Sequence, residues 1–343
     1  MIRVGWIGCG RHASEMLLPQ LTRLPVVLAA ICDSDPARLA ETGRRFGVAA
    51  ERRHADAHAL LDAGGVDAIG LAAGPLAHRD LAIAALGRGL PVFVEKPPGA
   101  SEADARAIAD ASSRAGRPAV LGFMKRFSTA NRIAINLLDA GAVAPRASFL
   151  GEYMTAPTYF AGDADYTGFY LHHCVHYLDL VPLLMGRPVE LRARRHELAP
   201  GRLLLHVDLA FESGALGTLV MGTHQSRGTP MEWWQVMGDH ARVEVRNVHE
   251  VRLYRAPPFK ADEPGATLSA DADTLSWEPN LTVAADEDHK GYRALLAAWL
   301  DVIAGRPRPD APTIADGVAA MRLLEAMVES IASGRALALP AQP

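Results

Sequence analysis

The sequence predicts two domains, a doubly wound α/β domain followed by an α+β domain. Over the first 122 residues, short apolar runs alternate with helical patterns, which is typical of a parallel sheet covered by helices on both faces. Beyond residue 123, strand patterns follow one another and are joined by turn sequences such as ESG and GDH, which indicates antiparallel pairing. The length of 343 residues fits two domains. We expect them over residues 1–122 and 123–343.

Each element of the first domain has its own signal. Near-continuous apolar runs such as VVLAAI suit strands that are buried on both faces. Strands are expected at residues 2–8, 26–32, 66–72, 91–94 and 119–123. Helices are expected after the first strand to about residue 24, and at residues 36–46, 76–88 and 103–115.

The second domain mixes alternating strand patterns with helical ones. Strands are expected at residues 148–155, 190–197, 203–212, 216–224, 232–237, 242–247 and 251–254. Helices are expected at residues 130–140, 170–185, 289–304 and 314–333. The polar, proline-containing stretch 257–279 reads as an irregular loop.

Composition excludes several classes of protein. Lys and Arg number 35 against 39 Asp and Glu, and no block of like charges stands out, so neither nucleic acid nor an anionic membrane surface is the expected partner. Three scattered cysteines do not make a disulfide framework. The first residues, MIRVGWIG, lack the pattern of an export signal, and no apolar run could span a bilayer. We therefore expect a cytoplasmic protein.

A glycine-rich turn follows the first strand and opens a helix. Residues 8–13 read G-x-G-x-x-A, a pattern that in this context is typical of dinucleotide binding. Gly8 permits the tight turn, Gly10 lets the backbone approach a pyrophosphate, and the small Ala13 allows close packing of helix on strand. Free N–H groups at the helix start would hold the phosphates, although an ordinary tight turn is the alternative. The expected cofactor contacts come from Gly8, Cys9, Gly10, Arg11, His12 and Ala13.

An acidic residue stands where the adenosine ribose would lie. Asp33 ends the second predicted strand, 20 residues after Ala13. A carboxylate there accepts hydrogen bonds from the ribose hydroxyls and repels a 2′-phosphate, which favours NAD and leaves NADP as the second option. Asp33 could instead cap the next helix. Both roles are compatible if Asp33 contacts the ribose while Ser34 or Asp35 provides the cap.

Further motifs extend this pattern over nearly the whole chain. They are AAGPLAHRDLAIAALGRGLPVFVEKP, GFMKRF, LHHCVHYLDL and GYRALLAAWLDVIAGRPRP. Together with residues 8–13 they make the chain resemble the glucose-fructose oxidoreductase / inositol dehydrogenase (Gfo/Idh/MocA) family. The resemblance implies an N-terminal Rossmann domain and a C-terminal open, mainly antiparallel sheet, one face of which often forms a dimer contact. It also implies NAD(P)-dependent oxidation or reduction of a CH–OH group on a sugar, cyclitol or related polyol, in a homodimer or homotetramer.

The resemblance assigns roles to Lys96 and His176. Lys96 of the E-K-P motif would lie beside the nicotinamide and the reacting oxygen, where a cation stabilises a developing alkoxide. A solvated surface lysine is the alternative. His176 matches the family histidine that accepts the hydroxyl proton, a task that suits a near-neutral pKa.

The histidine segment departs from the family at two positions. His172 replaces the family's Asp, and Cys174 replaces its Gly. On a helix, His172, His176 and Asp179 would share a face, with His172 as a relay and His173 and Cys174 as packing residues. An imidazole supplies no negative charge, and neighbouring imidazoles disfavour each other's protonation. A metal site at these residues and packed core histidines are the alternatives, and we expect no metal.

Other expected contacts follow from position in the motifs. Ala73, in place of the family's T-P pair, and Glu95 would line the cofactor, and His78 would be structural or adjacent to the cofactor. Arg126 would meet an anionic group of the substrate or serve structure. Tyr153 lies outside these motifs, and it would border the substrate because of its position on the first predicted strand of the second domain. Two other functions stay open, a redox-neutral NAD-dependent enzyme that cleaves glycosides and a non-catalytic nucleotide-binding regulator.

Overall fold

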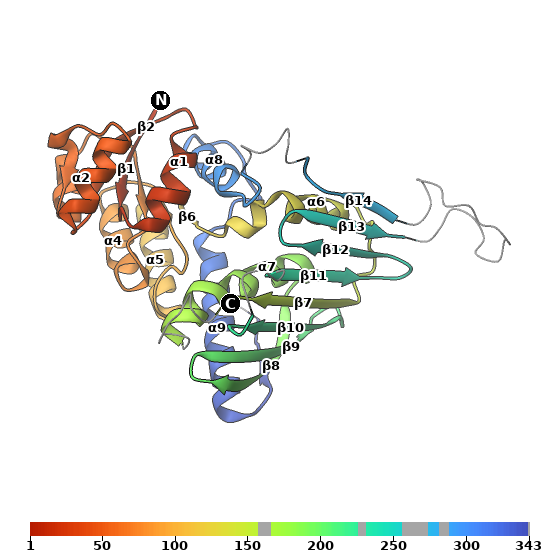
Figure 1. Ribbon diagram of the computed structural model, residues 1–343. Coiled ribbons are helices and arrows are strands. Elements are labelled where there is room, and N and C mark those ends of the chain that lie inside the picture. The colour runs from red at the N-terminus through yellow and green to blue at the C-terminus, as the bar shows by residue number, and fades with distance from the viewer. Residues whose placement is uncertain (157–165, 226–230, 256–273, 281–287, 342–343) are drawn as a thin grey trace. The chain divides into compact units, whose positions relative to one another are not determined.

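The structure, a computed structural model, describes residues 1–156, 166–225, 231–255, 274–280 and 288–341 (Figure 1). The chain divides into two compact units. Unit 1 comprises Met1–Phe127 and Gly291–Leu323, and unit 2 comprises Ser128–Lys290 and Leu324–Pro343. No helix in these described ranges is both long and apolar enough to cross a membrane.

Unit 1 is built on a six-stranded parallel sheet of order β3-β2-β1-β4-β5-β6. This is the order of a Rossmann fold, in which the strand order reverses at β1 and opens a crevice at the carboxyl ends of the strands. The strands are β1 (Ile2–Ile7), β2 (Val26–Cys32), β3 (Arg53–His54), β4 (Ala68–Leu71), β5 (Val92–Val94) and β6 (Ala119–Leu121). The short β3 was not predicted, and it pairs with Ile31 and Cys32 at the end of β2.

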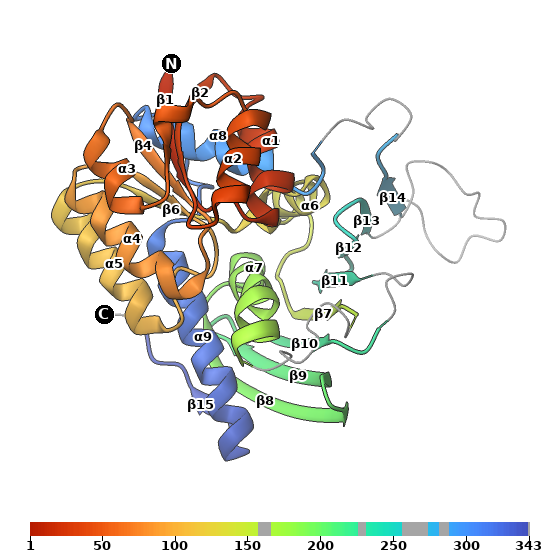
Figure 2. The ribbon, with the colours of Figure 1, turned by 60° about the vertical axis from the view of Figure 1, so that its left-hand side comes forward.

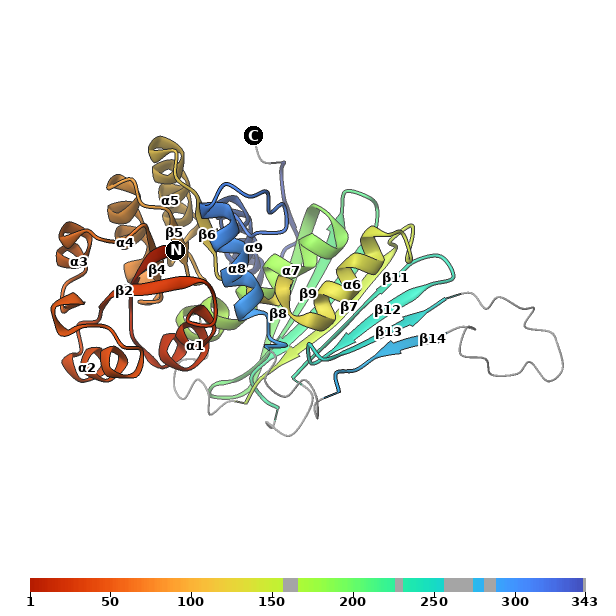
Figure 3. The ribbon, with the colours of Figure 1, turned by 90° about the horizontal axis from the view of Figure 1, so that it is seen from above.

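Helices cover both faces of this sheet. In Figure 3, α3, α4 and α5 lie along one face, and α1, α2 and α8 along the other. The helical segments are η1 (Ala13–Leu17), α1 (Leu18–Leu21), α2 (Pro36–Arg45), η2 (Ala50–Arg52), α3 (Ala57–Ala63), α4 (Pro75–Gly87), α5 (Glu102–Ala115), η3 (Met124–Phe127), α8 (Tyr292–Ile303) and the first part of α9 (Ile314–Ser333). Helix α3 was not predicted.

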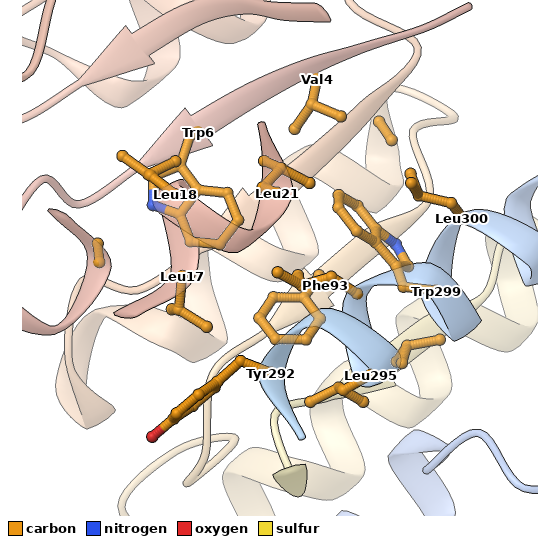
Figure 4. Packing of buried hydrophobic residues seen from close by; sticks show 14 of the residues in the cluster. Val4, Trp6, Leu17, Leu18, Leu21, Phe93, Tyr292, Leu295, Trp299 and Leu300 are labelled. Atoms are coloured by element: carbon orange, nitrogen blue, oxygen red, sulfur yellow. The ribbon is translucent and has the colours of Figure 1, made fainter. Parts of the chain in front are cut away.

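The placement of α8 differs from the predicted domain limits. The sequence assigns everything after residue 122 to the second domain, but Gly291–Leu323 belongs to unit 1. The reason is packing, because α8 buries Trp299 against Phe93 of β5, with ring centroids 5.6 Å apart. Trp6 of β1 stacks on the same phenylalanine at 6.0 Å, so β1, β5 and α8 share one core (Figure 4).

Unit 2 carries a nine-stranded sheet of order β14-β13-β12-β11-β7-β10-β9-β8-β15 within the described ranges. All its pairs are antiparallel except β7 with β10. The strands are β7 (Ser148–Met154), β8 (Pro188–Ala199), β9 (Arg202–Phe211), β10 (Leu216–Gly222), β11 (Glu232–Met237), β12 (Arg242–Arg246), β13 (Glu250–Tyr254), β14 (Thr274–Trp277) and β15 (Leu337–Ala338). The predicted fold class is confirmed.

Two predictions in unit 2 need correction. Strand β14 lies within the predicted loop 257–279, because its residues pair with β13; residues 257–273 fall outside the described ranges. The predicted helix 170–185 has two parts, the π-helix η5 (Tyr166–Cys174) and α7 (Val175–Met185). Helices α6 (Thr129–Asp139) and α7 lie on one face of the sheet (Figure 3).

Candidate functional site: a dinucleotide site and a histidine helix

The glycine turn is shaped by close backbone approach. Gly8 has φ +97°, and a Cβ there would lie 2.4 Å from the carbonyl oxygen of Ala72, so only glycine fits. Its N–H donates to the carbonyl of Cys32 at 2.8 Å. Gly10 is different, because a Cβ built there would meet no described atom within 4 Å. That open space beside the start of a helix suits a pyrophosphate.

Asp33 holds the turn from the neighbouring strand. Its buried carboxylate accepts the N–H of Cys9 at 2.7 Å and the N–H of Asp35 at 2.8 Å. Asp35 is the N-cap of α2, because its side chain accepts the N–H groups of Ala37 and Arg38. The cap therefore comes from Asp35, and neither Asp33 nor Ser34 provides it.

Glu95 and Lys96 follow β5 at the carboxyl edge of the sheet. Oε2 of the buried Glu95 accepts the N–H of Lys96 at 3.0 Å, and Oε1 lies 3.6 Å from Nε2 of His12. Burial alone would raise the pKa of Glu95, but His12, Lys96 and His78 outweigh it and hold that pKa below its ordinary value. The E-K-P motif thus contacts the helix that opens at the glycine turn.

The environment of Lys96 is that of a chemically tuned amine. Burial lowers the pKa of Lys96, the Glu95 carboxylate opposes that shift, and the charge of Lys125 adds to it. Lys96 is only half-buried and Lys125 is buried. A fully solvated surface lysine would not show this shift, so the environment favours the functional interpretation of Lys96.

His78 joins two loops beside this edge. Its Nε2 accepts the N–H of Gly74 at 3.2 Å, and its Nδ1 lies 2.8 Å from the carbonyl oxygen of Pro97. Because a ring nitrogen that accepts cannot carry the proton, the neutral ring donates from Nδ1. Burial lowers the pKa of His78. His78 therefore has the geometry of a structural residue, whereas Ala73, next to Gly74, is exposed.

Arg126 has an ion-pair partner within unit 1. Its guanidinium lies 2.9 Å from the carboxylate of Asp316, and its side chain is only 9% exposed. Asp316 also accepts the N–H and the hydroxyl of Thr313 at the start of α9. This arrangement favours the structural alternative for Arg126.

The histidine segment lies on the π-helix and the helix that follows it in unit 2. His172 on η5 is half-buried, and His176 and Asp179 on α7 are buried. π-Helical turns are rare and frequently occur at functional sites. Phe169 and His173, four residues apart in this segment, stack with ring centroids 6.0 Å apart. The same spacing separates His172 from His176.

Tyr153 has a hydrogen-bond partner that was not predicted from the sequence. The Tyr153 hydroxyl is hydrogen-bonded to Nδ1 of His173, a residue predicted to serve packing only. Tyr153 also lies against Tyr177, whose hydroxyl donates to Glu232 at 2.7 Å. The only sequence signal is Tyr153 itself, since Glu232 becomes its neighbour through the pairing of β7 with β11.

These features define an enzyme class before any comparison. A Rossmann sheet, a glycine turn with open space at Gly10 and a buried carboxylate at the end of β2 fit an NAD-dependent oxidoreductase. The family profile described as "Oxidoreductase family, NAD-binding Rossmann fold" matches residues 2–123. The profile "Oxidoreductase family, C-terminal alpha/beta domain" matches residues 155–339. The chain belongs to the Gfo/Idh/MocA family of NAD-binding oxidoreductases.

Similar proteins span the whole chain. A D-apiose dehydrogenase from Rhizobium rhizogenes is 28% identical over 343 residues, covering 96% of this chain and 95% of the relative. An inositol 2-dehydrogenase from Saccharopolyspora erythraea is 27% identical over 350 residues, covering 97% and 94%. Among solved structures, levoglucosan dehydrogenase in complex with NADH has a TM-score of 0.84 at 19% identity, covering 99% and 100%. An Agrobacterium radiobacter oxidoreductase in complex with NAD+, L-tartaric acid and magnesium has a TM-score of 0.81 at 23% identity, covering 98% of each chain.

Proposed function

We propose that this protein is an NAD(H)-dependent dehydrogenase or reductase that acts on a CH–OH group of a sugar, cyclitol or related polyol. The observation that carries the proposal is the position of Lys96, a half-buried lysine that directly follows buried Glu95 at the carboxyl end of β5 and whose pKa is lowered by burial. The names of the full-length relatives, D-apiose and inositol dehydrogenases, support the substrate class.

In the proposed mechanism the protein's residues stabilise the developing charge and transfer protons. NAD, when bound, accepts or supplies the hydride. Lys96 donates a hydrogen bond to the reacting oxygen and stabilises the negative charge that develops there. His176 takes the hydroxyl proton in oxidation and returns it in reduction, with His172 as relay. Tyr153, through its bond to His173, orients the segment that carries both histidines.

The turn residues hold the cofactor in this proposal. The N–H groups at the helix start, with Gly10, Arg11, His12 and Ala13, hold the pyrophosphate. The Asp33 carboxylate faces the ribose and disfavours a 2′-phosphate, so NAD is preferred over NADP. Ser34, Ala73 and Glu95 border the same cofactor. Arg126 serves structure through Asp316.

We also propose a homodimer or homotetramer formed through the outer face of the nine-stranded sheet, in the cytoplasm. Leu150 on β7 and Leu216 on the adjacent β10 are 37% and 63% exposed, and apolar side chains on an open sheet suit a second copy. The three cysteines are free thiols, which suits a reducing compartment. Light scattering of the wild type and of Leu150→Arg tests the assembly, which fails as a proposal if the wild type is monomeric.

The test of function is NADH formation across inositols, aldoses and sugar acids, with NAD and NADP side by side. We expect a substrate with NAD, and we expect Lys96→Met to lower turnover by about 10²–10³-fold, the range for losing one donor to a developing oxyanion, while NADH still binds. Lys260→Met, a change at a lysine outside these motifs, is the control. Normal turnover by Lys96→Met would refute the role of Lys96. Tightly retained NAD without net NADH would indicate the redox-neutral enzyme, and NAD binding without turnover but with a defined protein partner would indicate the regulator.

A further inference from the structure

We propose that Trp6 is a positioning residue for NAD, because its indole N–H fixes the peptide unit between Gly8 and Cys9 in the form that receives the pyrophosphate. Trp6 lies on β1 before the glycine motif. Its Nε1–H donates to the carbonyl oxygen of Gly8 at 3.0 Å, and this bond is buried. The residue reaches the turn through its own side chain and needs no contact with the cofactor.

The peptide unit between Gly8 and Cys9 is hydrogen-bonded at both ends. The indole N–H of Trp6 donates to the Gly8 carbonyl oxygen, and the Cys9 N–H donates to the Asp33 carboxylate at 2.7 Å. The preceding N–H, that of Gly8, is bonded to Cys32. Gly8 has φ +97° and no side chain to restrict it. Because the peptide unit is planar, both bonds restrain the same plane. Without the indole bond, the Asp33 bond alone would hold that plane, and the following N–H groups would point less uniformly at a phosphate.

Neighbouring core residues leave a space that fits the indole ring of Trp6. Trp6 is fully buried, and a Cβ on Gly70 of the adjacent β4 would lie 2.2 Å from the indole ring. The ring therefore occupies space that exists only because residue 70 is a glycine. Phe93 also stacks on the indole ring, with ring centroids 6.0 Å apart (Figure 4). An aliphatic residue could fill a core position, but it could not donate to Gly8.

Trp299 provides a matched control in the same hydrophobic cluster. It is also fully buried and also contacts Phe93. Its indole N–H has no hydrogen-bond partner among the described residues. Trp6→Phe and Trp299→Phe therefore remove similar aromatic surface from one core, but only the first removes a bond to the phosphate turn.

The expected effect is on cofactor affinity. If the turn samples other conformations before binding, the apparent dissociation constant rises in inverse proportion to the competent fraction. A buried neutral hydrogen bond is worth enough to weaken binding by about threefold to tenfold. NADH and ADP-ribose both carry the pyrophosphate and should weaken equally. AMP lacks it and should be less affected.

The experiment is calorimetric titration of NADH, ADP-ribose and AMP into the full-length wild type, Trp6→Phe and Trp299→Phe, with the free energy of unfolding of each protein measured alongside. A fourth protein carries β-(3-benzothienyl)alanine at position 6, which replaces the N–H by sulfur and keeps the ring size. If Trp6→Phe fails to fold, the benzothienyl protein is compared with the wild type in its place. Weaker NADH and ADP-ribose binding in both position 6 proteins, but not in Trp299→Phe, is the expected result. Wild-type affinity in the benzothienyl protein, or an equal loss in Trp299→Phe, would overturn the proposal.

Discussion

The Tyr153 hydroxyl and Nδ1 of His173 lie 2.5 Å apart, and their rings stack with centroids 5.7 Å apart. Tyr153 comes from β7 and His173 from the π-helix η5. Phe169 stacks on His173 as well, at 6.0 Å. The pair thus ties η5 to the sheet, one residue from His172 and three from His176.

This contact should appear as an energetic coupling. In a double-mutant cycle of Tyr153→Phe and His173→Gln, we expect a coupling of about 1 kcal/mol in the free energy of unfolding, the net value of one partly buried hydrogen bond. Urea denaturation of the four proteins measures it. Tyr254→Phe on β13 is the control, and its cycle with His173→Gln should show no coupling. Strictly additive effects of the Tyr153 and His173 changes would contradict the expectation.

Two substitutions at Asp33 should separate its effect on the choice between NADH and NADPH from its effect on NADH affinity. Asp33→Asn removes the negative charge and keeps one oxygen, which can accept the Cys9 N–H, while its NH2 group cannot accept the Asp35 N–H. The NADH/NADPH affinity ratio should fall by about tenfold or more, since one charge contact is worth ~1.4 kcal/mol or more. Asp33→Ala also removes the acceptor, and NADH affinity should fall by about a further tenfold. Calorimetry with both cofactors measures these ratios. An unchanged ratio in Asp33→Asn would show that the carboxylate does not select the cofactor.

His78 should make stability depend on pH. Its folded-state pKa lies below the ordinary value of 6.5 because the ring is buried, so below about pH 6.5 the unfolded chain binds a proton that the folded protein does not. The free energy of unfolding should therefore fall as the pH drops from about 7 to 5, with a slope of at most ~1.4 kcal/mol per pH unit from this residue. Protonation would also break the bond from Gly74 to Nε2.

The variant His78→Gln isolates this contribution. His54 and His249 also have pKa values lowered by burial, so the wild type and the variant both lose stability in acid. The difference between their slopes, measured by urea denaturation between pH 5 and pH 7.5, belongs to His78. Parallel curves would show that His78 is protonated equally in both states.

Arg126 should contribute to stability. Its side chain is 9% exposed and paired with Asp316, so Arg126→Gln leaves a partly buried carboxylate without its cation, at a cost of about 3 kcal/mol in the free energy of unfolding. Arg88 pairs with Asp62 in a more exposed position, and Arg88→Gln should cost less than about 1 kcal/mol. If Arg126→Gln has normal stability but a raised KM, the structural role is refuted and Arg126 contacts the substrate.

Local signals predicted the fold well. The runs of β2 and β11 and the long α9 begin and end where the sequence predicts, because burial or amphipathic spacing is readable along one segment. The two residues of β3 carry no such pattern and become a strand only through Ile31 and Cys32. The π-helical form of η5 was not predicted either, because an apolar pattern along the chain indicates a helix but does not distinguish a π-helix from an α-helix.

The candidate site could also be predicted only where its residues form a local sequence pattern. The glycine turn and Asp33 are predictable because their chemistry follows from spacing. The bond from Cys9 to Asp33 depends on how the ends of β1 and β2 meet. The bond from Trp6 to Gly8 spans only two residues, but it depends on the space that Gly70 of β4 leaves for the indole ring. Arg126 could not be assigned, because its partner Asp316 lies 190 positions further along the chain.

Residues 291–323 belong to unit 1. This limits where recombination with the gene of a relative can give a folded protein. A crossover after residue 122 would inherit Phe93 from one parent and Trp299 from the other, although the two rings are packed together. Viable chimaeras would need a second breakpoint near residue 290, so that α8 travels with its sheet. The Rossmann unit is therefore encoded in two separated stretches of the sequence, and its evolutionary history should be traced with both stretches together.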